Sequence, residues 1–184
     1  MESLVGIVLA AGAGTRFGRP KALVETAGGT PWLTVAVELL RDAGCGRMLV
    51  VLGARALEVP PPTGVEVVVA DDWETGMSAS LRAGLIAASA SPPVITAALL
   101  TLVDLPELPL AVVRRIAAEP FDDATLRQAV FEGRPGHPVL IGRDRWSAVA
   151  ASASGDSGAR RYLAGHGVAE IECGDLFDGH DVDR

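Results

Sequence analysis

Glycines and basic residues are concentrated near the start of the chain, in the stretch VLAAGAGTRFGRPKAL at 8–23, directly behind an apolar run. Glycines leave backbone N–H groups free to surround phosphate oxygens, while Arg16 and Lys21 add a planar fork and a mobile point charge. The stretch is not a Walker A loop, because Lys21 follows Pro20 and no Ser or Thr comes next to bind Mg²⁺. It is not a Rossmann fingerprint, because Phe17 replaces the third small residue. We expect either a phosphate-binding loop of another kind or a glycine-rich turn with solvated charges.

The pattern L-A-A-G-x-G-T-R-x-G-x-P-K in this stretch resembles the N-terminal motif of nucleotidyltransferases with a glycosyltransferase-A-like fold. These include sugar-phosphate nucleotidyltransferases, the cytidylyltransferase of isoprenoid synthesis and the MobA-like enzymes of molybdenum cofactor maturation. The resemblance implies that the loop wraps an NTP triphosphate, with Lys21 facing the α-phosphate and Arg16 neutralising charge as a second catalytic residue. It implies the nucleotide-binding residues Leu9, Ala10, Ala11, Gly12, Gly14, Thr15, Arg16 and Lys21.

A second motif, DDWETGMSASLRAGL at 71–85, follows a predicted strand. Ser78 or Thr75 would cap the helix that begins there, and a functional interpretation adds base or ribose contacts from the Gly76 backbone and the Ser80 hydroxyl. The stretch resembles the W-x-x-G-M-x-x-S-L-x-x-G-L segment of molybdenum cofactor cytidylyltransferases, the MocA-like branch. This implies CTP as the nucleotide, with Gly76, Ser78 and Ser80 in its site.

A carboxylate ends the next apolar run, in LLTLVDLPEL at 99–108. Asp104 is either a turn residue or an oxygen ligand for nucleotide-bound Mg²⁺ beside the glycine-rich loop. The family has Asp-x-Pro here, so the resemblance implies that Asp104 is catalytic and binds the metal, Mg²⁺ or alternatively Mn²⁺. The closing GHDVDR resembles the family's D-x-D-T-P segment, which implies Asp181 or Asp183 as a second metal ligand. The chain stops at Arg184, before that segment's Thr, Pro and final helix, and a frayed end is the alternative.

Two further stretches, GRPGHPVLIG at 133–142 and SGDSGARRYLAGH at 154–166, carry polar residues in the second half. His137 is either structural or a ligand contact. Asp156 is either a helix N-cap, with Arg160 on the surface, or part of a helix N-terminus that presents Arg160 to an acceptor phosphate. Both stretches resemble MocA-like motifs, G-x-x-G-H-P-V-L and G-D-x-G-A-R, that face the pterin substrate. The resemblance implies His137, Asp156 and Arg160 as acceptor-binding residues.

Alternating elements must position these side chains. The pattern predicts strands at 4–10, 48–52, 65–70, 95–103, 125–130, 138–141 and 168–173, with a turn at 133–136. It predicts helices at 31–43, with Thr30 as N-cap, and at 78–89, 110–118, 144–151 and 157–164. This alternation predicts an α/β fold: three layers, a mostly parallel sheet and helices on both faces. Ligands of such sheets bind beyond the carboxyl ends of the strands.

The composition narrows the class of protein. The formal charge is −7, and the aromatic residues are four Phe, three Trp and one Tyr. This argues against nucleic-acid binding, which needs basic surface and stacking platforms. The longest apolar stretch, 94–103, is about half a membrane span, the start lacks signal-peptide features, and Cys45 and Cys173 fit two buried thiols in a reducing compartment. We therefore expect a soluble, cytoplasmic protein without nucleic-acid or membrane partners.

Together these features predict one nucleotidyltransferase domain over 1–184, with a nucleotide-binding half at 1–107 and an acceptor-binding half at 108–184. The resemblance implies a Mg²⁺-dependent enzyme that moves CMP from CTP to a phosphorylated acceptor, molybdopterin or the molybdenum cofactor, and releases pyrophosphate. The alternatives are a GTP-using molybdenum cofactor guanylyltransferase, a sugar-phosphate nucleotidyltransferase, and a cofactor-binding chaperone or nucleotide sensor with low turnover. Transient contact with a molybdoenzyme or its chaperone is a further expectation.

Overall fold

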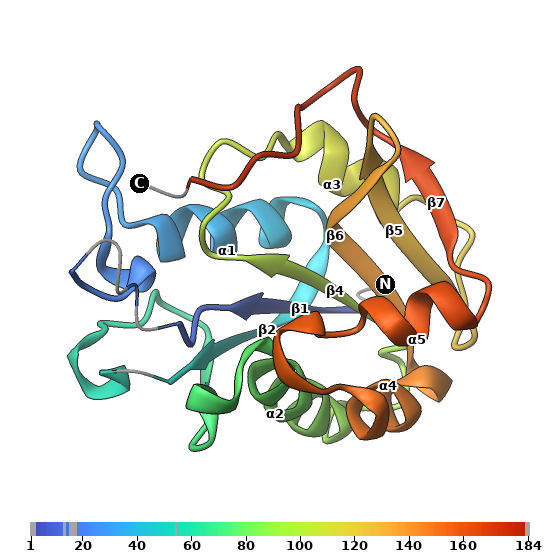
Figure 1. Cartoon of the computed structure of the whole chain (residues 1–184), viewed down its shortest axis with the longest axis horizontal. Coiled ribbons are helices and arrows are strands. Elements are labelled where there is room, and N and C mark those ends of the chain that lie inside the picture. Colours follow the sequence, from blue (N-terminus) through green and yellow to red (C-terminus); the bar gives the residue numbers. More distant parts are fainter. Residues whose placement is uncertain (1–2, 13, 15–17, 54, 183–184) are drawn as a thin grey trace.

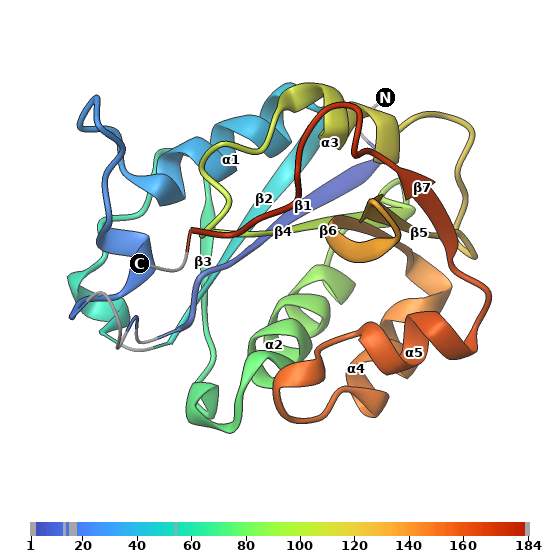
Figure 2. The same ribbon diagram turned by 45° about the horizontal axis from the view of Figure 1, so that its top comes forward.

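A computed structural model describes residues 3–12, 14, 18–53 and 55–182 of the chain, and in this part seven strands form one sheet between two layers of helices (Figure 1, Figure 2). The strands are β1 Leu4–Leu9, β2 Cys45–Leu52, β3 Glu66–Val69, β4 Ala97–Leu102, β5 Leu126–Phe131, β6 Arg134–Gly142 and β7 Ala169–Glu172. The helices are α1 Trp32–Asp42, α2 Met77–Ser89, α3 Leu110–Ile116, α4 Trp146–Ser152 and α5 Arg160–Gly165. The sheet order is β3-β2-β1-β4-β6-β5-β7.

The sheet is mostly parallel, as predicted. β1 pairs in parallel with β2 and β4, β2 with β3, and β5 with β7, while β6 runs antiparallel to both β4 and β5. Figure 2 shows α1 and α3 on one face of the sheet and α2, α4 and α5 on the other. The three-layer α/β architecture is confirmed, and it places the ends of β1 and β4 side by side.

Two apolar cores hold the layers together, one on each face of the sheet. β1 serves both, because alternate residues point to opposite faces: Leu4 and Val8 pack under α1 and α3, whereas Val5 and Ile7 pack under α2, α4 and α5. Every residue of β1 is buried, which explains why its sequence is a continuous apolar run rather than an alternating one.

The hairpin between β5 and β6 is tighter than the sequence predicted. Its turn consists of Glu132 and Gly133, at φ 52° and 75°, and two consecutive residues with positive φ are typical of the shortest hairpin turns. The predicted turn at 133–136 is therefore wrong, because β6 already begins at Arg134. His137 consequently lies inside a strand rather than at its start.

Three predicted helix caps are also wrong. Pro31, not Thr30, occupies the N-cap position of α1. The N-cap of α2 is Gly76, at φ 104°, so neither Thr75 nor Ser78 caps that helix. Asp156 lies in a separate short turn, Gly155–Ser157, because Gly158 at φ 51° interrupts the chain before α5 begins. Glycine occupies these positive-φ positions without the strain that a side chain would add.

The prediction of two buried thiols is confirmed. Cys45 and Cys173 are both free and buried, and burial raises the pKa of the Cys45 thiol to about 12. In the described part of the chain, we find no helix of the length and apolarity that a bilayer crossing requires.

Candidate functional site at the carboxyl ends of β1 and β4

The glycine-rich loop and Asp104 lie at the same edge of the sheet. Leu9 at the end of β1 is in register with Leu102 at the end of β4, and the Val103 N–H donates to the Leu9 carbonyl over 3.2 Å. Because the two strands are parallel, the residues that follow them emerge together. This end of the sheet opens into a cavity of about 610 Å³, here called the first cavity.

An ion pair links the loop to the end of β4. The Lys21 Nζ lies 2.8 Å from the Asp104 Oδ2, and both side chains are largely buried, with exposed fractions of 18% and 16%. Lys21 opens a short 3₁₀ turn behind Pro20, which has the fixed φ of a proline, −53°. Gly14 closes the loop from the other side, at φ +59°, where a Cβ atom would collide with the Arg19 carbonyl. The local backbone thus places the Lys21 ammonium beside the Asp104 carboxylate, which is 83 residues away in the sequence.

The Asp104 carboxylate has the properties of a metal ligand. Its Oδ1 atom is buried and accepts no hydrogen bond from the residues that the structure describes, and a buried oxygen without a partner is costly unless something binds it. Divalent Mg²⁺ and Mn²⁺ prefer such hard oxygen ligands. No group of three or more potential metal-ligating side chains occurs among the described residues.

The second predicted metal ligand is only partly placed. Asp183 lies outside the described residues. Asp181 does not line the first cavity; it lines a separate depression beside Arg134 and Arg160. The segment nevertheless reaches the site, because the Val182 N–H donates to the Asp104 carbonyl over 3.0 Å. Up to Val182 the expectation of a frayed end is therefore wrong.

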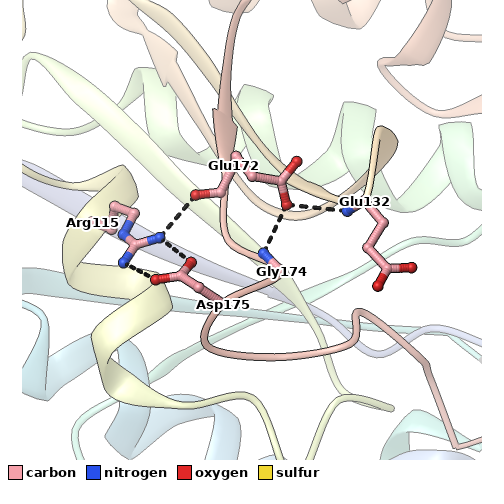
Figure 3. A network of polar contacts seen from close by, with 5 residues as sticks. All are labelled: Arg115, Glu132, Glu172, Gly174 and Asp175. Atoms are coloured by element: carbon pink, nitrogen blue, oxygen red, sulfur yellow. Dashed lines mark hydrogen bonds and ion pairs between the residues drawn. The ribbon is translucent and has the colours of Figure 1, made fainter.

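A network of polar contacts holds the segment that leads from β7 to Val182 (Figure 3). Arg115 of α3 donates to both carboxylate oxygens of Asp175, over 2.6 and 2.9 Å, and to the Glu172 carbonyl. The Glu172 carboxylate accepts from the N–H groups of Gly174 and Glu132. The hydrogen bond from Arg115 lowers the pKa of Asp175, and the backbone donors, Gly174 first, lower that of Glu172.

Removing the guanidinium should loosen this segment. We expect Arg115→Met to speed hydrogen exchange at the Val182 amide, because the segment loses its anchors on Asp175 and Glu172, while amides of β1 keep their protection. Exchange followed by NMR measures this. The matched control is Arg114→Met, since the neighbouring Arg114 donates instead to the Asp42 carbonyl, over 3.2 Å. Equal exchange at Val182 in both variants would contradict the assignment.

Lowering the pH should also loosen the segment that leads from β7 to Val182. Because the folded protein lowers the pKa values of Asp175 and Glu172, it binds fewer protons there than the unfolded chain does. The stabilisation is complete above the ordinary carboxyl pKa range and is lost as the pH falls through the lowered values. We expect exchange at the Val182 amide to accelerate on acidification in wild-type protein and to change less in Arg115→Met, after correction for intrinsic exchange rates.

A second cavity, of about 270 Å³, adjoins the first on the side of β6 and α5. The two share Leu9, Met77 and Asp156. His137 lines the second cavity, and its Nδ1 atom is buried without a partner among the described residues. Burial lowers the pKa of His137, against smaller opposing effects of the Leu100 backbone and the Asp104 charge, so a neutral imidazole faces the cavity at neutral pH.

The predicted nucleotide and acceptor motifs meet between the two cavities. A Cβ atom on Gly76 would collide with the Asp156 Oδ1 and would lie 2.8 Å from the Gly155 carbonyl. Only a glycine allows this approach. The residues before α2 and those before α5 therefore form one continuous wall, although they are far apart in the sequence.

Most of the predicted site residues line these cavities. The first cavity is lined by Leu9, Ala10, Ala11, Gly12, Gly14, Lys21, Gly76, Ser80, Asp104 and Asp156. The second is lined by His137, Asp156 and Arg160. Ser78 lines neither and is buried within α2, and Thr15 and Arg16 lie outside the described residues. Trp73, Glu74 and Met77 also line the first cavity, although no role for them was predicted from the sequence.

The Rossmann-like sheet carries a glycine-rich loop and a carboxylate at the ends of adjacent parallel strands, which is where open α/β sheets bind their ligands. The chain belongs to the MobA-like NTP transferase domain family, whose profile matches residues 6–171. By this membership it is a nucleotidyltransferase.

Three other proteins resemble this chain in sequence or in fold, one of them in two structures. Nicotine blue oxidoreductase from Paenarthrobacter nicotinovorans is 36% identical, with all of this chain and 93% of the relative covered. The crystal structure of Rv0371c from Mycobacterium tuberculosis H37Rv is 29% identical, with 98% and 92% covered and a TM-score of 0.80. Another structure of Rv0371c is a complex with manganese, with 28% identity, 99% and 94% coverage and a TM-score of 0.74. A nucleotidyl transferase from Methanothermobacter shares the fold, with 24% identity, 100% and 93% coverage and a TM-score of 0.81.

Proposed function

We propose that this nucleotidyltransferase depends on Mg²⁺ or Mn²⁺ and moves CMP from CTP to a phosphorylated acceptor, molybdopterin or the molybdenum cofactor, with release of pyrophosphate. The observation that carries the proposal is the Lys21–Asp104 pair in the cavity formed by the glycine-rich loop. It combines a cation for phosphate oxygens with a carboxylate for a metal. Manganese in a structure of the relative Rv0371c supports a divalent metal.

The reaction needs no nucleophile from the protein, because an acceptor phosphate attacks the α-phosphorus of CTP directly. The backbone N–H groups of Gly12 and Gly14 surround the triphosphate, and Lys21 and Arg16 offset the negative charge that develops on the α-phosphate and the leaving pyrophosphate. Asp104 would hold the metal, which neutralises phosphate charge when bound. Positioning and charge neutralisation then provide most of the rate enhancement.

On the nucleotide side, we place the base and ribose against the residues before and at the start of α2. Gly76 and Ser80 line the first cavity there. The Gly76 N–H already donates to the Trp73 carbonyl, so the Gly76 carbonyl, as a further acceptor, and the Ser80 hydroxyl are the groups available for hydrogen bonds. Ser78 is buried in the helix, and we assign it a supporting role. The preference for CTP rests on the MocA-like pattern of residues 71–85, and GTP is the alternative donor.

On the acceptor side, we assign the second cavity to the pterin. It places apolar side chains of the sheet beside polar groups at His137, Asp156 and Arg160. The Nδ1 atom of a neutral His137, which has no partner among the described residues, is available to a heterocycle, and Arg160 offers a guanidinium to a phosphate. The acceptor would enter beside Asp156, which both cavities share. A sugar phosphate is the alternative acceptor.

An oxidoreductase activity is the second candidate, favoured by the name of the relative that is 36% identical over the whole chain. A protein that binds nucleotide or cofactor with little turnover is a third. The two buried free thiols are in keeping with the cytoplasmic location that we propose. Transient contact with a molybdoenzyme or its chaperone also stays a prediction.

Three assays separate these candidates. In a thermal-shift screen of the four NTPs with Mn²⁺ or Mg²⁺, we expect CTP to stabilise the protein most, because a ligand that binds the native state raises its stability. We then expect pyrophosphate release from CTP only when molybdopterin is added. Oxidation of NADH or NADPH by a dye acceptor, without pyrophosphate release, would support the oxidoreductase instead. Nucleotide binding without either reaction would support the third candidate, a protein that binds nucleotide with little turnover.

A further inference from the structure

Trp73 lies at the edge of the first cavity, although its motif carries no predicted role for it. It opens a short 3₁₀ turn, Trp73–Thr75, that follows β3, and its side chain is half-buried. The same cavity is lined by Ala10 and Ala11 of the glycine-rich loop and by Gly76. A large aromatic side chain therefore stands between the two segments that we assign to the nucleotide.

The position of the Trp73 side chain is fixed by close packing against the end of β2. A Cβ atom on Gly53 would lie 2.5 and 2.6 Å from the Cβ and Cγ atoms of Trp73 and 2.8 Å from the Ala11 carbonyl oxygen. Because Gly53 has no side chain, Trp73 and the start of the glycine-rich loop both pack directly against its backbone. The base of the indole is consequently held beside the start of the glycine-rich loop.

The backbone of the turn adds to this restraint. The Trp73 N–H donates to the Ala70 carbonyl over 3.2 Å, and the Gly76 N–H donates to the Trp73 carbonyl over 3.1 Å. Asp72 forms an ion pair with Arg82 of α2, 3.1 Å between Oδ2 and Nη1. A side chain held this way loses little conformational freedom when a ligand packs against it.

The first cavity is lined by charged side chains at Lys21 and Asp104 and by an aromatic side chain at Trp73. The ion pair suits phosphates and a metal, whereas an indole suits the flat face of a nucleobase, and stacking of this kind tolerates every base because each has a π face. A nucleoside triphosphate carries the same two kinds of group at its two ends.

We propose that Trp73 is the platform on which the base of the nucleotide stacks. The proposal rests on the proposed function, because it takes an NTP to be the ligand of the first cavity. Trp73 then provides affinity for any nucleoside triphosphate, while the choice among bases is made by hydrogen bonds at the base edge.

Tryptophan fluorescence tests the contact directly. Trp32 and Trp146 are buried in the two cores, with exposed fractions of 6% and 2%, so a ligand in the first cavity should change chiefly the emission of Trp73. We expect CTP and GTP with Mn²⁺ to quench the wild-type emission, and inorganic tripolyphosphate with Mn²⁺ to leave it unchanged. In Trp73→Phe the quenching should disappear.

Calorimetry with two variants tests the contribution to affinity. We expect Trp73→Leu to raise the Kd of CTP and GTP by about 10-fold, because a leucine fills space but cannot stack, and to leave the Kd of tripolyphosphate unchanged. Trp73→Phe keeps an aromatic face and should retain most of the affinity.

Each outcome bears on the proposal. Unchanged affinity of Trp73→Leu for both nucleotides would overturn it, and so would an equal loss for tripolyphosphate, since Trp73 would then only support the loop. If wild-type protein binds tripolyphosphate but neither nucleotide, or binds none of the three ligands, the proposed function fails together with the stacking.

Discussion

Asp104→Asn lowers the rate of pyrophosphate release by about 10²-fold or more in our expectation, while the chain stays folded. The substitution keeps the shape of the side chain but removes the negative charge that faces Lys21 and, in our proposal, the metal. The side chain follows the end of β4 and belongs to neither apolar core, so the fold should survive. Steady-state release of pyrophosphate from CTP and acceptor measures the effect, with circular dichroism to monitor folding.

The matched control for this prediction is Glu107→Gln. Glu107 is an exposed carboxylate three residues further along the same loop, so the variant loses the same charge outside the cavity. We expect it to keep near-wild-type turnover. If purified, folded Asp104→Asn shows the same turnover as Glu107→Gln, Asp104 is not a ligand of the catalytic metal.

Lys21→Met should have two effects of opposite sign. Turnover falls by about 10²-fold, because a charge that stabilises the transition state is lost. The affinity for Mn²⁺ in the absence of nucleotide rises by about tenfold, because the cation that now neutralises Asp104 at 2.8 Å is removed. Electron paramagnetic resonance of unbound Mn²⁺ measures the second effect without any catalysis.

This pair of effects would mean that Lys21 neutralises the Asp104 carboxylate in place of the metal until nucleotide binds, which is here called its placeholder role. When phosphates bind, Lys21 can turn to them and leave Asp104 to the metal that they bring. Arg19→Met is the control, since Arg19 is an exposed cation in the same loop and its loss should change Mn²⁺ affinity little. An equal rise in both variants would attribute the effect to net charge, and an unchanged affinity in Lys21→Met would contradict the placeholder role.

The sequence was most informative where short-range patterns dominate. The apolar run before the first glycines predicted β1, and similar runs predicted β2 and β4, because a strand buried on both faces needs apolar residues throughout. The alternation of such runs with helical patterns predicted the layers of the fold. Helix caps were predicted less well, because the positions before α2 and α5 are set by glycines such as Gly76 that another segment approaches closely.

In the candidate site, too, the sequence indicated individual residues but not the contacts between distant segments. The sequence pointed to Lys21, Asp104 and Asp156 as separate residues, each within a recognisable motif, but their roles stay predictions. It carried no signal for the contact between Gly76 and Asp156 or for the bond from Val182 to Asp104. Trp73 stood in a motif without a function until its packing against Gly53 placed it at the cavity.

The sequence by itself therefore determined which segments are strands, which loop carries glycines and cations, and which carboxylate ends β4. These properties depend on side-chain periodicity and turn chemistry over a few neighbouring residues. Only the tertiary structure decided that Lys21 meets Asp104 and that the two cavities join at Asp156. Those contacts depend on the strand order β3-β2-β1-β4-β6-β5-β7, which is fixed by the burial of both faces of the sheet at once rather than by any local preference.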